Sequence, residues 1–172
     1  MSSPIFSFPP LADHNARLLI LGSMPGEASL KANEYYAHPR NQFWSIINSL
    51  FASAPFPDYT AKTQCLLQQR IALWDVMQSC IRPGSLDSAI EQTSIIANDF
   101  NRFLLQHPAI KHIFFNGATA ATTFNKRVLP ELQHPTLQLH RLPSTSPAHA
   151  SMSLQQKLLA WGVLQQFTQT DN

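Results

Sequence analysis

The sequence predicts an α/β fold in which helices cover both faces of a central, mostly parallel, four-stranded sheet, so that the chain forms three layers (α/β/α). Four short apolar runs alternate with segments of helical periodicity, and this alternation is typical of parallel sheets with right-handed crossovers. The runs are almost continuously apolar, as expected of strands buried on both faces. With 172 residues, 44% of them hydrophobic and 13% charged, we expect one globular domain over residues 1–172.

Each predicted strand ends at or near a glycine, a proline or a polar residue. In chain order the predicted strands are Arg17–Leu21, Ile71–Val76, His112–Phe115 and Leu137–Leu142. Parallel sheets of this kind bind ligands beyond the carboxyl ends of their strands. We therefore expect the site in the segments that follow the strands, which are Gly22–Ser29, Asp75–Ser79, Asn116–Thr119 and Pro143–His149.

Helices are predicted where apolar residues recur at helical spacing between and after the strands. The predicted ranges are Asn41–Phe51, Asp58–Arg70, Ile95–Leu105 and Ala118–Val128, followed by a C-terminal helix. In that last helix Ser153 and Gln156 match a capping box, and the apolar stripe consists of Leu154, Leu158, Trp161 and Leu164. The Pro-rich stretches Pro4–Pro10 and Ala54–Asp58 predict surface loops.

Composition excludes several classes of protein. Cys65 and Cys80 are too few for a disulfide framework or a four-thiolate cluster, so we expect reduced thiols. No apolar run approaches the roughly 20 residues that span a bilayer, and the N-terminus lacks a signal-peptide pattern, so we expect a cytoplasmic protein that needs no membrane. The histidines lack metal-ligand spacing, so neither a metal nor a cofactor is expected. The net charge of +2 permits a nucleic-acid partner without requiring one.

Two of the segments that follow strands have the composition of phosphate-binding loops. GSMPG, residues 22–26, consists mainly of small residues that let backbone amides approach an anion, and Pro25 fixes a turn. The Ser/Pro-rich segment 143–151 offers hydroxyls and amides that bind phosphates without reading sequence. A plain strand-to-helix turn and an ordinary loop before a capped helix are the alternatives.

The segment NEYYAHPRNQFW, residues 33–44, is the least ordinary part of the chain. An aromatic ring such as that of Tyr36 can stack on a base that has been flipped out of a duplex, and Arg40 can contact a phosphate. The alternative is a helix approach with exposed aromatic residues.

Together, GSMPG, YYAHPRNQFW and the Pro-Ser-rich loop resemble the uracil-DNA glycosylase superfamily, and within it the hypoxanthine-DNA glycosylase family most closely. The likeness extends roughly from Arg17 to Phe167, and its specific part is Tyr36–Trp44. The resemblance implies a monofunctional enzyme of base excision repair that flips and hydrolytically removes a deaminated base, hypoxanthine first among the candidates, from DNA. It also implies the superfamily's three-layer fold.

Two positions depart from the uracil-excising relatives. Met24 stands where the mismatch-specific enzymes have a water-positioning Asn, and Leu142 stands where the classical uracil enzymes have a catalytic His. The hypoxanthine family carries its catalytic Asn in the His-Pro-Arg-Asn stretch, which implies that Asn41 orients the attacking water. An amide is no base, so this role is positioning.

The resemblance assigns further roles around the base. Tyr36 would stack on it, and Asp75 falls near the position where uracil enzymes read the base edge with an Asn. An ionised Asp only accepts hydrogen bonds, which suits the N1–H of hypoxanthine; a capped turn or an ion pair with Arg82 is the alternative. Asn116 would hydrogen-bond the base or, alternatively, cap the helix that follows it.

The remaining predicted site residues contact the base or the DNA backbone. Around the first loop, Ser23 and Met24 are expected at the base and Gly26 at the DNA. The other expected DNA contacts are His38, Arg40, Ser144, Thr145 and Ser146. His38 donates to the leaving purine or, alternatively, is a structural His bonded to backbone. No Lys stands in these loops as a Schiff-base nucleophile, so no lyase step is expected.

Three other functions remain open. The first is a uracil- or mismatch-specific (G:U/G:T) glycosylase, and the second is a catalytically inactive protein that binds damaged DNA. The third, an α/β enzyme acting on a phosphorylated metabolite, lacks the glycine-rich phosphate loop or carboxylate cluster that would support it. We expect a monomer, because an enzyme that flips bases needs a free face for DNA.

Overall fold

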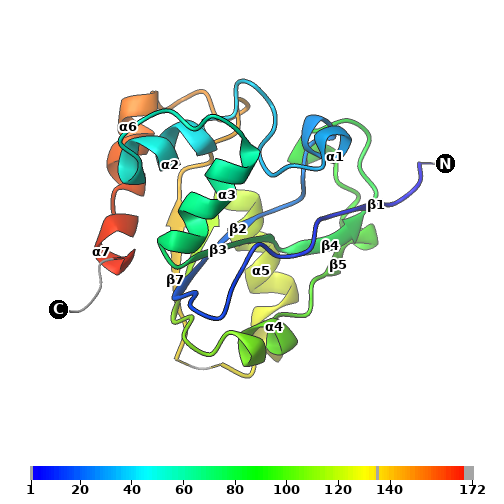
Figure 1. Ribbon diagram of the computed structural model, residues 1–172. Coiled ribbons are helices and arrows are strands. Elements are labelled where there is room, and N and C mark those ends of the chain that lie inside the picture. The colour runs from blue at the N-terminus through cyan, green and yellow to red at the C-terminus, as the bar shows by residue number, and fades with distance from the viewer. Residues whose placement is uncertain (1, 135, 169–172) are drawn as a thin grey trace.

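The computed structural model describes residues 2–134 and 136–168, and it has the predicted three layers (Figure 1). The central sheet contains β2 (Leu18–Gly22), β3 (Ile71–Asp75), β6 (His112–Asn116) and β7 (Gln138–Leu142) in the order β3-β2-β6-β7. All three neighbouring pairs are parallel, so the prediction of a mostly parallel four-stranded sheet is confirmed. Three strands differ from their predicted ranges by one residue at one end, and β2 is shifted by one residue at both ends.

Three strands, β2, β3 and β6, are buried on both faces, which explains their continuous apolar runs, whereas the edge strand β7 is partly exposed. Alternate residues point to opposite faces. Residues such as Leu19, Leu21 and Trp74 pack on one face against α4 (Phe100–Gln106) and α5 (Ala118–Arg127). Their sequence neighbours pack on the other face against the remaining helices of the layers, which are α2 (Phe43–Phe51), α3 (Tyr59–Gln68), α6 (Leu154–Trp161) and α7 (Leu164–Thr168).

Local signals in the sequence set several helix starts. Asp58 accepts a hydrogen bond from the Ala61 amide at 2.8 Å, and Asp99 accepts one from the Arg102 amide at 3.0 Å. The predicted capping box of Ser153 and Gln156 is present. The apolar stripe of the last helix was predicted correctly for Leu158, Trp161 and Leu164, which pack into the core, and wrongly for Leu154, which is 43% exposed. The predicted single C-terminal helix is divided at Gly162 into α6 and α7.

A second sheet corrects two predictions. β1 (Ile5–Phe6), β4 (Met77–Cys80) and β5 (Ile96–Ala97) pair antiparallel in the order β1-β4-β5, beside the short helix α1 (Glu27–Ala32) in Figure 1. Pro4–Pro10 is therefore not all loop. The helix predicted over Ile95–Leu105 is wrong in its first part, because Ile96–Ala97 pairs with β4 and the Asp99 cap starts the helix at Phe100. A strand of two residues is too short to show a periodic pattern in the sequence, so only its pairing with another strand in the structure identifies it.

Three short 3₁₀ helices complete the fold, at Asp87–Ala89, Gln92–Ser94 and Leu129–Glu131. Within residues 2–134 and 136–168, no helix combines the length and the apolar composition that crossing a membrane requires. The parallel sheet brings the carboxyl ends of all four strands to one edge, and this is the edge that carries the site.

Gly117, directly after β6, is required by the packing of that edge. Its φ of 94° and ψ of 176° lie in a region that is almost restricted to glycine. A Cβ atom at this position would lie 2.9 Å from the Cβ of Ser144, in the loop after β7. We expect Gly117→Ala to lower the free energy of unfolding by about 3 kcal/mol, measured by urea denaturation, because backbone strain and a steric clash add.

Gly84→Ala is the matched control for this variant. Gly84 also has a positive φ, 73°, but a Cβ atom added there would meet no heavy atom within 4 Å beyond its chain neighbours. We expect Gly84→Ala to lower the free energy of unfolding by about 1 kcal/mol, from backbone strain alone. Equal losses in the two variants would contradict a tight contact between Gly117 and Ser144.

Candidate active site

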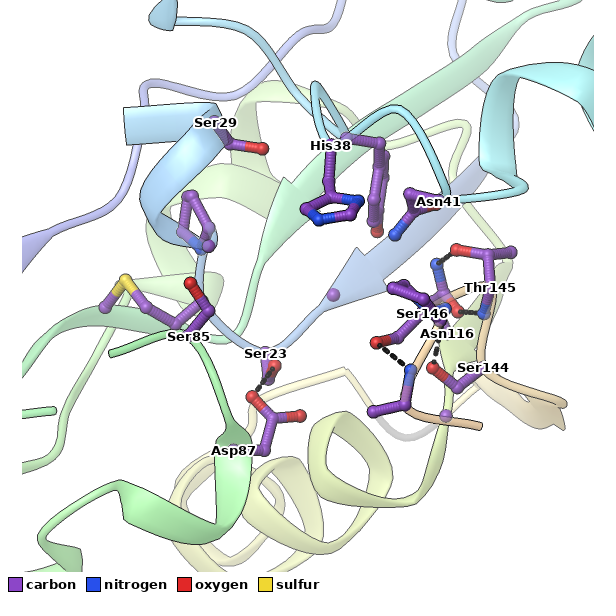
Figure 2. Close-up of a pocket in the computed structure, with 18 of the residues that line it drawn as sticks. Ser23, Ser29, His38, Asn41, Ser85, Asp87, Asn116, Ser144, Thr145 and Ser146 are labelled. Atoms are coloured by element: carbon purple, nitrogen blue, oxygen red, sulfur yellow. Dashed lines mark hydrogen bonds between the residues drawn. The ribbon is translucent and has the colours of Figure 1, made fainter. Parts of the chain in front are cut away.

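A cavity of about 670 Å³ opens at the carboxyl edge of the sheet (Figure 2). It is formed by the loops after β2, β3, β6 and β7, by the approach to α2, and by the loop around residues 85–88. All the site residues predicted from the sequence line it: Ser23, Met24, Gly26, Tyr36, His38, Arg40, Asn41, Asp75, Asn116, Ser144, Thr145 and Ser146. The structure therefore brings together residues from five separate segments of the chain.

The floor of the cavity lies over Gly22, the last residue of β2. A Cβ atom there would lie 2.6 Å from Oδ1 of Asp75 and 2.8 Å from the hydroxyl of Tyr36, so only glycine leaves room for both oxygens. Neither the Tyr36 hydroxyl nor Oδ2 of Asp75 has a hydrogen-bond partner among the described residues. Two buried polar atoms thus meet at the floor with unused hydrogen-bonding capacity, which a bound ligand can satisfy.

Tyr36 reaches the floor because of its backbone conformation. Its φ of 54° lies in the left-handed region, which is uncommon for a residue other than glycine. Its ring stacks on Phe43 with a centroid distance of 4.2 Å. Burial, followed by the charge of Asp75, raises the pKa of the Tyr36 hydroxyl, which therefore stays protonated. One ring face is covered by Phe43, so the predicted stacking on a base would use the other face.

Asp75 is 4% exposed, and burial raises the pKa of its carboxyl to about 7. The charge of Asp87 raises this pKa further, and Arg82 lowers it. The sequence-based alternative of an ion pair is not realised: the Arg82 guanidinium donates to the carbonyls of Gly84 at 2.8 Å and Pro25 at 2.7 Å. The expectation that Asp75 is simply ionised also changes, since a carboxyl with this pKa is protonated to a large extent near neutral pH.

Asp87 is a site residue that the sequence reasoning missed. Its Oδ1 accepts a hydrogen bond from the Ser23 hydroxyl at 2.9 Å, and both residues line the cavity on the side away from Asn41 (Figure 2). Nearby, the Ser85 hydroxyl accepts from the Glu27 amide at 2.9 Å and joins the 85–88 loop to the first turn of α1. The turn-forming run from Pro83 to Ser88 was visible, but it follows β4, a strand that was not predicted.

Asn41 and His38 enter the cavity from the approach to α2 (Figure 2). Oδ1 of Asn41 accepts from the Phe43 amide at 2.9 Å, which leaves its Nδ2 donors for the cavity. Nδ1 of His38 accepts from the Arg40 amide at 3.1 Å, so a neutral His38 carries its proton on Nε2. His38 can therefore bond the backbone through Nδ1, as the structural interpretation requires, and still donate from Nε2, as the interpretation as a donor to the purine requires. Arg40 lies exposed at the rim.

Asn116 joins two of the loops. Its Nδ2 donates to the Thr145 hydroxyl at 3.0 Å, and its Oδ1 accepts from the Thr145 amide at 2.9 Å. The alternative of a helix cap is not realised, since Gly117 is the N-cap of α5 and no side chain caps it. Thr145 is fully buried, and its hydroxyl accepts from Asn116 and holds the loop; the phosphate contact of its side chain stays a prediction. Ser144 and Ser146 remain partly exposed.

Met24 is 6% exposed and packs in a small cluster with Met77 and Ile90. The thioether is therefore largely taken up by this packing, and the contact of Met24 with a base stays a prediction. Among the described residues, no group of three or more His, Cys, Asp and Glu side chains is arranged to hold a metal ion.

Comparison with known proteins places the chain in one family. The family model for the uracil DNA glycosylase superfamily matches residues 9–165. The chain is 34% identical over 147 residues to a protein of Methanosarcina acetivorans named hypoxanthine DNA glycosylase, an alignment that covers 85% of this chain and 89% of that protein. It is 36% identical over 111 residues to a protein of the same name from Methanosarcina barkeri, covering 64% and 69%.

A solved structure agrees with these matches. The solution NMR structure of a candidate uracil DNA glycosylase from Methanosarcina acetivorans superposes with a TM-score of 0.75 at 30% identity, covering 95% of this chain and 99% of that one. Family match, relatives and architecture lead to the same assignment: the chain belongs to the uracil DNA glycosylase superfamily.

Proposed function

We propose that this chain is a monofunctional DNA N-glycosylase that flips deoxyinosine out of DNA and hydrolyses its N-glycosidic bond, releasing hypoxanthine in base excision repair. The observation that carries the proposal is the cavity, which has Asn41 in one wall and the unpartnered carboxyl oxygen of Asp75 at its floor. Its volume suits the enclosure of a small ligand such as a flipped base. The two relatives named hypoxanthine DNA glycosylase support the choice of base.

In the proposed reaction the bond between C1′ of the sugar and N9 of the base breaks, and its electron pair stays with the base. The sugar passes through an oxocarbenium-like transition state, and water adds to C1′ and releases a proton to solvent. Asn41 holds that water through its Nδ2 donors and the second lone pair of Oδ1, the first being occupied by the Phe43 amide. Its contribution is orientation of the water.

Base recognition falls to the floor of the cavity. Hypoxanthine has an N1–H beside one carbonyl, whereas uracil has an N–H flanked by two. The Asp75 carboxyl can accept the N1–H of hypoxanthine. The free face of the Tyr36 ring would stack on the base.

Polar groups around the cavity would hold the DNA backbone. The hydroxyls of Ser144 and Ser146 each accept a backbone amide of their own loop, and their hydrogens remain free to donate to phosphate oxygens. The first residues of α5, a ten-residue helix without a side-chain cap, also line the cavity, and helix N-termini attract anions. Asn116 and Thr145 would position this loop rather than touch the phosphates.

A uracil-directed glycosylase is the second candidate, favoured by the description of the solved relative. Met24 packs in an apolar cluster, and Leu142 is buried, so neither position supplies the catalytic group that the uracil-excising enzymes carry there. A panel of duplexes with a single deoxyinosine, deoxyuridine or G:T mismatch separates the two candidates.

Removal of the Asn41 side chain tests the proposed reaction. We expect the wild-type protein to make an alkali-labile site at deoxyinosine in a labelled duplex. We expect Asn41→Ala to lower the single-turnover rate at least about a hundredfold, because the water is no longer oriented. The loss of the hydrogen bond to the Phe43 amide should cost about 1 kcal/mol of stability, so the rate is measured well below the unfolding temperature.

Asn48→Ala is the matched control for Asn41→Ala. Asn48 lies in the same helical region and also bonds backbone, donating to the Ala54 carbonyl, but it lies outside the cavity. The single-turnover rate of Asn48→Ala should stay within about threefold of the wild-type rate. If folded wild-type protein binds lesion duplexes and cuts none of them, the catalytic proposal fails and damage binding takes its place.

Arg40 tests the proposed backbone contacts. We expect Arg40→Gln to weaken duplex binding similarly for lesion and undamaged DNA, because a phosphate contact carries no sequence information. A plot of log affinity against log salt concentration should become shallower by about 1, as expected when one counterion fewer is released. A loss confined to the deoxyinosine duplex would instead put Arg40 at the base.

A further inference from the structure

Two carboxyl groups face the cavity from different parts of the chain. Asp75 ends β3 at the floor, and Asp87 begins the short 3₁₀ helix on the wall beside Ser23. Their environments differ. Oδ1 of Asp87 accepts the Ser23 hydroxyl, whereas Oδ2 of Asp75 is buried without a partner among the described residues.

These environments decide which carboxyl holds a proton. Two neighbouring carboxylates in a low-dielectric site do not both ionise readily, so the better-solvated one ionises first. Burial raises the pKa of Asp87, but the Ser23 hydroxyl, Arg82 and Thr119 each lower it. For Asp75, burial and then the Asp87 charge raise the pKa, and only Arg82 opposes them. Of the two carboxyls, Asp75 therefore has the stronger tendency to hold a proton.

We propose that Asp75 binds hypoxanthine as a carboxylic acid, donating its O–H to O6 and accepting N1–H with its other oxygen, and that Asp87 is the positioning residue that keeps Asp75 protonated. The proposal rests on the proposed glycosylase function and deepens it. It gives both oxygens of the Asp75 carboxyl a hydrogen-bond partner, including Oδ2, which is buried without one among the residues that the structure describes. It also gives the cavity a paired donor and acceptor that match the amide edge of the purine.

The acid form assists the reaction as well as recognition. As the bond from C1′ to N9 breaks, the electron pair spreads over the base and places negative charge on O6. A hydrogen bond from a neutral acid stabilises that charge, whereas a carboxylate would repel it. Asp75 keeps its proton in this scheme. The water that adds to C1′ gives a proton to solvent, and the released base takes one proton from solvent on a ring nitrogen.

The other ionisable groups around Asp75 do not change the assignment of the proton to its carboxyl. Tyr36 faces it across Gly22, and Tyr35 lies nearby; burial raises the pKa of both hydroxyls, so both stay neutral. The Arg82 guanidinium donates to the Gly84 and Pro25 carbonyls. The further ionisable residues of the cavity lining are Glu27, His38, Arg40 and His149. His38 and Arg40 approach from the α2 side, and neither contributes to the pKa of Asp75.

The test is the pH dependence of single-turnover excision from a deoxyinosine duplex between about pH 6 and pH 9. If the acid form is active, the wild-type rate falls about tenfold per pH unit above a pKa near 7. Asp75→Asn should react at a lower rate that no longer falls in this range, because an amide offers one donor and one acceptor at every pH. Asp87→Asn should shift the fall in rate to lower pH, because the negative charge that raises the pKa of Asp75 is removed.

Glu91→Gln is the control for Asp87→Asn. It removes one negative charge from an exposed side chain of the same connecting segment, outside the cavity, and should leave the decline where it is in wild type. Affinity for a duplex with a 2′-fluoroarabino analogue of deoxyinosine, which resists cleavage, shows that each variant is folded and binds DNA.

The outcomes separate the two proposals. A wild-type rate that rises from pH 6 to pH 9 overturns the acid form, and this result needs no variant to fold. A decline that survives in Asp75→Asn assigns the titration to another group, such as His38, and also overturns it. A decline that does not move in Asp87→Asn removes the role of Asp87. If no protein cuts deoxyinosine at any pH, the glycosylase function itself fails.

Discussion

The parallel pairing of β2, β3, β6 and β7 is the constraint on which the rest of the site depends. It brings four carboxyl ends to one edge, with strands about 4.8 Å apart, so that residues distant in sequence become neighbours. Its register sets Gly22 beside Asp75 and Asn116 beside Leu142. Burial of both sheet faces fixes that register, because a slip by one residue would exchange every side chain between the two core clusters.

From this edge, a short series of hydrogen bonds extends to the residue proposed to hold water. Asn116 at the end of β6 pairs with Thr145, the Thr145 carbonyl accepts the Gln42 amide at 3.0 Å, and the neighbouring Asn41 side chain accepts the Phe43 amide. Buried polar contacts of this kind fix a side chain to within a fraction of an ångström, which is what orientation of water requires. Residues at the ends of β6 and β7 thus help to set the geometry of the side chain proposed to hold the water.

The floor of the cavity is stable only because the surrounding core holds it in place. A buried polar group without a partner costs about 1–3 kcal/mol, and the Tyr36 hydroxyl and Oδ2 of Asp75 are both in this state. Such conflicts with local stability are expected at functional sites, where a ligand completes the hydrogen bonds. The same burial that destabilises the free protein controls the protonation of Asp75, so packing and chemistry cannot be separated at this position.

The sequence by itself determined the four strands of the parallel sheet, the capped helices and most of the segments that form the cavity, because these depend on local periodicity, caps and turn residues. The resemblance of its motifs to a known family indicated Asn41, and the position of Asp75 after a predicted strand, with the same resemblance, indicated Asp75. Only the tertiary structure decided that Ile96–Ala97 is a strand, that Asp87 lies in the cavity, and that Thr145 and Met24 are buried. It also decided that Asp75 shares its site with a second carboxyl. Each of these depends on contacts between segments far apart in the chain, and burial, pairing and charge coupling have no local signature.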